Sequence, residues 1–138
     1  MRLRFAVKLV LVALPLLLLV IGASSQAPAP PAAPKNGSVT HVVVCWLKNP
    51  KDLAARKQLI EATHGFKSIP GVVSVSTGQV LPTTRPHSDS SFDVGIVINF
   101  NDAEALQAYI KDPIHQKAVK EVLAPLAKDW KTFDFTNE

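Results

Sequence analysis

The 138-residue sequence contains one cysteine, one tyrosine and four histidines. A single cysteine excludes an intrachain disulfide, and Cys45 lies in the apolar run HVVVCWL, which favours a small buried residue over a reactive thiol. The histidines lack the close pairing of metal ligands, so we predict no metal site. The sequence also has no Gly-rich phosphate loop and no activated Ser or Cys motif, and we expect no cofactor.

The sequence also has almost no net charge once the N-terminal residues are left out. The formal net charge is +4, from 15 basic and 11 acidic residues. Three of the basic residues, Arg2, Arg4 and Lys8, precede a long apolar stretch, and without them 12 basic residues stand against 11 acidic ones. Clustered lysine and arginine are absent from the remainder, so the sequence gives no electrostatic reason to expect nucleic-acid binding.

Residues 1–25 have the pattern of a signal peptide. The uncharged stretch 9–23 is shorter than a typical membrane span, and Ala23-Ser24-Ser25 fits a cleavage site. We therefore expect export to the periplasm or the extracellular space. An uncleaved N-terminal anchor is the alternative, and it would be the protein's only attachment to a membrane. Residues 26–37 are rich in Ala and Pro and predict an extended linker.

Residues 38–138 form one predicted domain of about a hundred residues, long enough for one modest core. Their apolar periodicity predicts strand, helix, strand, strand, two helices and strand. The predicted ranges are 40–48, 51–68, 72–81, 92–100, 103–111, 113–126 and 131–135. This order is the split βαβ pattern of the α+β class, a ferredoxin-like antiparallel sheet with helices on one face.

The first predicted strand is apolar on both faces. His41, Val43, Cys45 and Leu47 point one way by strand parity, and the opposite face carries Val42, Val44 and Trp46. Helices can cover only one face of the sheet, and a large uncovered apolar patch usually marks an interface. We therefore predict a homodimer in which two sheets pack face to face, with Val42, Val44 and Trp46 in the interface.

Four segments occur together in a recognisable order: HVVVCWLK, IPGV, FDVGIVINFNDAEALQAYIKDPIHQKAVKEVLAPL and the closing FDF. In this order and spacing, about residues 39–135 resemble the stress-responsive A/B barrel family, also called Dabb domains. The resemblance implies a ferredoxin-like protomer and a dimer whose two sheets form an α/β barrel.

One relative in that family is the plant polyketide cyclase that forms olivetolic acid without metal or organic cofactor. The resemblance to its catalytic residues implies a site at His41, Tyr109 and His115. Two further positions of the cyclase's site, a tyrosine and a histidine, fall on Ala62 and Val94.

The residues themselves leave the roles of these side chains open. Asp112 and Pro113 predict a helix start that places His115 in the first turn, where the positive helix end favours a neutral, proton-accepting ring. The alternative is that His115 bonds its cap residue or packs over the helix start. Tyr109 either orients a ligand oxygen or only packs its ring, and His41 either lines a pocket mouth or is a hydrogen-bonded rim residue.

Three functions fit the pattern, and we rank binding first. A pocket between sheet and helices would hold a small apolar or aromatic molecule. Its predicted lining is Val43, Cys45, Ala62, Val94 and Ile96. The second hypothesis is a cofactor-free enzyme, cyclase-like or a related lyase or isomerase, with His115 as general base. The third is a structural dimer that binds no ligand.

Overall fold

The computed structural model describes residues 34–50 and 52–138. The predicted leader, 1–25, lies outside the described residues, as does most of the predicted linker. Within the described part of the chain, no helix has the length and apolar character needed to cross a bilayer.

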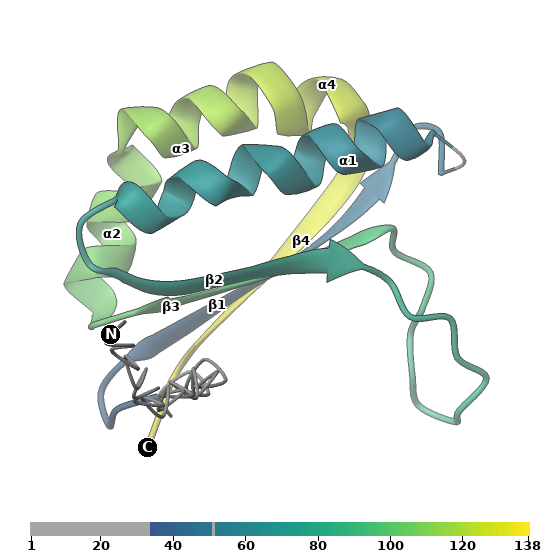
Figure 1. Cartoon of the computed structure of the whole chain (residues 1–138). Helices are drawn as coiled ribbons and strands as arrows, with labels where there is room; N and C mark the ends of the chain where they lie inside the picture. The colour runs from purple at the N-terminus through teal and green to yellow at the C-terminus, as the bar shows by residue number, and fades with distance from the viewer. Residues whose placement is uncertain (1–33, 51) are drawn as a thin grey trace, which may run out of the picture. The chain divides into compact units, whose positions relative to one another are not determined.

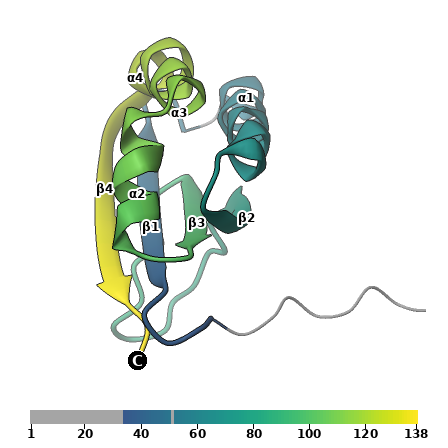
Figure 2. The same ribbon diagram turned by 90° about the vertical axis from the view of Figure 1, so that its left-hand side faces the viewer.

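The domain is a four-stranded antiparallel sheet in the order β2-β3-β1-β4. The strands are β1 (Val39–Leu47), β2 (Val72–Gln79), β3 (Val94–Phe100) and β4 (Ala127–Thr136). All helices of the described chain lie on one side of this sheet, with α1 over β2 and β3 (Figures 1 and 2). The predicted ferredoxin-like α+β fold is therefore confirmed.

The helical layer has two parts, one after β1 and one after β3. The first is α1 (Leu53–Ala62) followed by the 3₁₀ turn η1 (Thr63–Ser68). The second comprises α2 (Ala103–Lys111), α3 (Pro113–Ala118), η2 (Val119–Leu123) and α4 (Ala124–Leu126). The segment η2 is a π-helical turn, a wider turn that is frequent at functional sites.

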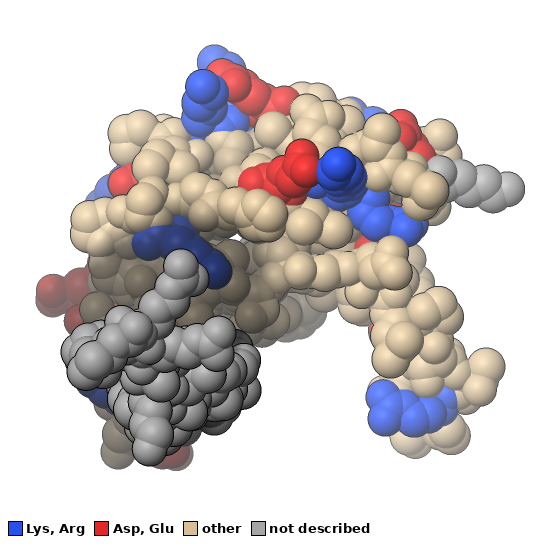
Figure 3. All heavy atoms as spheres, viewed as in Figure 1, with Lys and Arg blue, Asp and Glu red and all other residues tan. Residues whose placement is uncertain are grey.

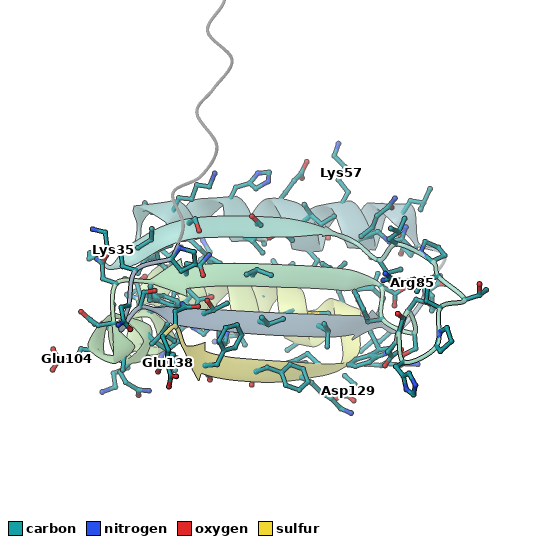
Figure 4. The ribbon with its side chains drawn as sticks, turned by 90° about the horizontal axis from the view of Figure 1, so that it is seen from below. Lys35, Lys57, Arg85, Glu104, Asp129 and Glu138 are labelled. Atoms are coloured by element: carbon teal, nitrogen blue, oxygen red, sulfur yellow. The ribbon has the colours of Figure 1, made fainter. Side chains whose placement is uncertain are left out.

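The two faces of β1 differ as strand parity predicts. His41, Val43, Cys45 and Leu47 are buried beneath the helices, whereas Val42, Val44 and Trp46 are half-buried on the opposite face. Figure 4 shows that opposite face, which no helix covers. We call this the open face; besides these three residues it includes the residues of β4 that pair with them.

Two details of the prediction were wrong. β4 begins at Ala127, four residues before the predicted start at 131, because β1 continues to pair with it through Cys45 and Trp46. Leu53 and Ile114 occupy periodic apolar positions in the helices predicted at 51–68 and 113–126, where an apolar face was expected, yet they are 69% and 43% exposed. Each lies in the first turn of its helix, where apolar spacing alone does not determine whether a neighbouring element covers the turn.

Candidate functional site

A cavity of about 270 Å³ lies between the sheet and the helices. Its walls are mostly aliphatic and aromatic, and its polar side chains come from several elements that are distant in sequence. The residues that line it are His41, Val43, Leu59, Ala62, Thr63, Phe66, Ile96, Tyr109, Ile110, His115, Ala118, Val119, Leu123, Trp130, Thr132 and Asp134.

The junction of α2 and α3 brings Tyr109 and His115 together. Asp112 ends α2, and its carboxylate also accepts a hydrogen bond from the Ile114 N–H at 2.8 Å, which caps α3. Pro113 then occupies the first helical position, where its missing N–H leaves no hydrogen bond unmade. Tyr109 is therefore in the last turn of one helix and His115 in the first turn of the next, with ring centroids 4.2 Å apart.

Tyr109 is buried within an aromatic cluster. Its side chain is 2% exposed, and its ring centroid lies 5.4 Å from that of Phe66 and 5.0 Å from that of Phe100. Burial raises the pKa of the phenol, so the hydroxyl stays protonated and can donate a hydrogen bond. In residues 34–50 and 52–138 no partner for this hydroxyl is found.

His115 has a defined tautomer. Its Nδ1 lies 3.2 Å from the carbonyl oxygen of Ile110, and because a carbonyl only accepts, Nδ1 carries the hydrogen and the neutral ring presents Nε2 as an acceptor. Burial has the largest effect and lowers the pKa of His115. The hydrogen bond to the Ile110 carbonyl raises this pKa in part, and His41 and Asp112 have smaller effects that lower and raise it, respectively. From the sequence, we expected the positive helix end to keep the ring neutral. In the structure, burial is the main cause of the lowered pKa.

His41 lies on the same cavity wall and is held by Asp134. The two residues are register partners on β1 and β4, and Nδ1 of His41 is 2.5 Å from Oδ1 of Asp134. The carboxylate accepts, so this contact orients the imidazole and leaves Nε2 for other contacts. The ring of His41 is buried, with its centroid 6.0 Å from that of Tyr109. His41, Tyr109 and His115 thus share one site.

The predicted lining residues divide into two groups. Val43, Ala62 and Ile96 line the cavity. The prediction was wrong for Cys45 and Val94, which do not line the cavity. These two residues are register partners on β1 and β3, have no exposed surface and belong to the hydrophobic core. Burial raises the pKa of Cys45 to about 11, which keeps it a thiol. Position 94, which corresponds to a site histidine in the cyclase, is therefore outside this cavity.

Several lining residues were missed from the sequence. Trp130, Thr132 and Asp134 face the cavity from β4, and the short predicted strand excluded the first of them. Pairing Asp134 with His41 across neighbouring strands was the available signal. Thr63 also lines the cavity, with its hydroxyl 2.7 Å from the Ile60 carbonyl oxygen.

Charged side chains show no concentration on the face drawn in Figure 3, where basic and acidic groups lie beside one another. Lys57 pairs with Glu61 and Lys117 with Glu121, with nitrogen–oxygen distances of 3.6 and 3.9 Å. Among the described residues, no group of three or more His, Cys, Asp or Glu side chains is placed to hold a metal ion.

Fold and site together define a ferredoxin-like α+β domain with an apolar cavity and a few convergent polar groups, the usual form of a small-molecule pocket. The chain belongs to the stress-responsive A/B barrel domain family, whose sequence model matches residues 39–137. A search among curated protein sequences found no significant match.

Solved structures show the same fold at low sequence identity. A Dabb family protein with a ferredoxin-like fold from Mesorhizobium loti is 23% identical, with a TM-score of 0.61, and the match covers 75% of this chain and 99% of that one. A hydroxynitrile lyase from Passiflora edulis is 16% identical (TM-score 0.64, 79% and 96% covered). A dimeric ferredoxin-like protein from Thermobifida fusca is 17% identical (TM-score 0.61, 76% and 95% covered).

Proposed function

We propose that the domain binds a small apolar or aromatic molecule in the cavity beneath the helices. The observation that carries this proposal is the combination of about 270 Å³ of space, apolar walls, and three polar rings gathered at one site: His41, Tyr109 and His115. A domain with only a structural role would gain stability by filling this space with its own side chains.

Binding is tested by a thermal-shift screen of small aromatics, followed by calorimetric titration of each compound that raises the melting temperature. Tyr109→Phe and His115→Gln are expected to weaken binding about tenfold, because the first removes the hydroxyl donor and the second replaces the fixed Nε2 acceptor with a flexible amide. His64→Gln is the matched control, since His64 is exposed and does not line this cavity. Unchanged melting across the panel would favour a purely structural dimer.

A second function, cofactor-free proton transfer, is favoured by the tautomer of His115. A neutral imidazole with a free Nε2 is the form that a general base needs. On a carbonyl compound, Nε2 would take a proton from the carbon beside the carbonyl. The C–H electron pair would form the enolate double bond, and the Tyr109 hydroxyl would stabilise the oxygen by a hydrogen bond. A lyase among the similar structures makes this chemistry worth testing.

Catalysis is tested by following exchange of the α-hydrogens of acetophenone, an aromatic ketone without a phenol, in deuterated water by NMR. His115→Gln is expected to lower the exchange rate at least about a hundredfold, within the usual range for a general base. An unchanged exchange rate in this variant would show that His115 is not the base. If the unaltered protein does not raise the exchange rate above that in buffer alone, binding remains the proposed function.

We also propose that two copies of the chain pair through their open faces. Val42, Val44 and Trp46 are half-buried there, and Phe133 and Phe135 are 55% and 52% exposed. A single chain leaves this apolar area in water, and dimers are recorded among proteins of the same fold.

Sedimentation of the Phe133→Glu variant tests the dimer. A glutamate on this apolar face would lose its hydration in a sheet–sheet interface, so we expect a monomer at micromolar concentration where the unaltered protein is a dimer. The matched control is Leu53→Glu, at a residue that is 69% exposed on α1, and it should remain dimeric. An unaltered protein that sediments as a monomer would contradict the proposal.

Export of the protein is a further proposal, supported by the sequence of residues 1–25 alone. The N-terminal peptide of the protein from its native host, identified by mass spectrometry, tests it. A mature start close to residue 26 supports cleavage, and an intact leader in the membrane fraction supports an anchor.

A further inference from the structure

The cavity lacks the charge that a carboxylate ligand needs. Among the residues that line it, all of them within the described chain, there is no lysine and no arginine. The wall does carry a carboxylate, that of Asp134, which is 47% exposed and bonded to His41. A buried ligand carboxylate would therefore meet apolar walls and a group of its own sign.

The two histidines of the lining do not give the cavity a net positive charge. His115 is neutral near neutral pH because burial lowers its pKa. His41 contacts Asp134 directly, so a protonated His41 is balanced by that carboxylate and a neutral His41 leaves the wall negative. In both states the lining has no net positive charge.

The hydrogen-bonding groups favour a hydroxyl on the ligand. Tyr109 supplies a protonated phenol, a donor whose partner is not found among the described residues, and His115 supplies Nε2, an acceptor. A ligand hydroxyl can accept from the first and donate to the second at the same time. The surrounding rings of Phe66 and Tyr109, whose planes meet at 84°, offer both an edge and a face to an aromatic ligand.

We infer that the cavity selects a neutral aromatic ring carrying a hydroxyl group, a phenol or an aromatic alcohol, over a carboxylic acid or an amine of similar size. A volume near the lower end of the usual range for ligand pockets suits a molecule with one ring. This inference rests on the proposed binding function and adds the class of ligand to it.

Three probes that share a phenol and differ in charge test the selection: 4-hydroxyphenylacetone, 4-hydroxyphenylacetate and tyramine. They are titrated calorimetrically into the purified protein at neutral pH. The neutral ketone is expected to bind at least about tenfold more tightly than the acid, because burial and the Asp134 carboxylate both disfavour the anion. It should also bind more tightly than tyramine, whose ammonium group would lose its hydration between apolar walls.

Two variants test whether the Asp134 carboxylate causes the preference for the ketone over the acid. Asp134→Asn should reduce the preference for the ketone over the acid about threefold to tenfold, because a neutral amide replaces the repelling charge. Asp129→Asn, on the same strand but outside the lining, should leave the preference unchanged. Equal or tighter binding of the acid or of tyramine would overturn the charge inference alone. If none of the three probes and no other small aromatic binds, the proposed binding function itself fails.

Discussion

A larger side chain placed in the cavity from α1 tests whether the cavity is an accessible ligand site. Ala62 lines the cavity and has some exposed surface, and Ala62→Leu places three more carbon atoms there. At about 0.8 kcal/mol for each buried CH₂ group, less a few tenths for helix propensity, the free energy of unfolding should rise by about 2 kcal/mol. The melting temperature should rise by about 10 °C, and binding of a phenol probe should weaken at least about tenfold.

Urea denaturation and calorimetric titration of the same protein samples measure both effects. The control is Ala54→Leu, at an exposed position of the same helix, which should change neither quantity appreciably. Extra carbon atoms in a filled core usually cost about 1 to 3 kcal/mol. A loss of stability in Ala62→Leu would therefore refute the presence of accessible space beside this residue, and unchanged probe binding would place the ligand elsewhere.

Two further predictions concern His115 and Gly71. Because burial lowers the pKa of His115 in the folded chain, the unfolded chain binds this proton first as pH falls below about 6.5. The free energy of unfolding should then fall more steeply between pH 7 and 5 than in His115→Gln, and parallel urea-denaturation profiles would contradict this. Gly71 has φ +84°, and an added Cβ would lie 2.5 Å from Cβ of Ala105. Gly71→Ala should therefore cost about 1 to 3 kcal/mol, whereas an unchanged urea midpoint would show that this turn tolerates a side chain.

The sequence predicted the fold well because its strongest patterns are local. Alternation along β1 and the Asp112-Pro113 helix start each depend on a few neighbouring residues. The error at β4 arose where tertiary pairing overrides local pattern: Lys128 and Asp129 interrupt the apolar pattern near its start, yet this segment pairs with the end of β1.

The site was predictable in part. His41, Tyr109 and His115 come from three different elements, and the resemblance to a known family supplied them together. Strand parity correctly placed Cys45 and Val94 on the helix-facing side, but parity does not say where along a strand the helices leave space. Asp134 was missed because its role depends on the register between the first and last strands.

A crystal structure of the protein with 4-hydroxyphenylacetone would show whether the cavity between sheet and helices holds an aromatic ligand. We expect the ring inside the cavity, with the phenol oxygen within hydrogen-bond distance of the Tyr109 hydroxyl and Nε2 of His115. A cavity filled by the protein's own side chains, or a probe bound only elsewhere at saturating concentration, would contradict this expectation.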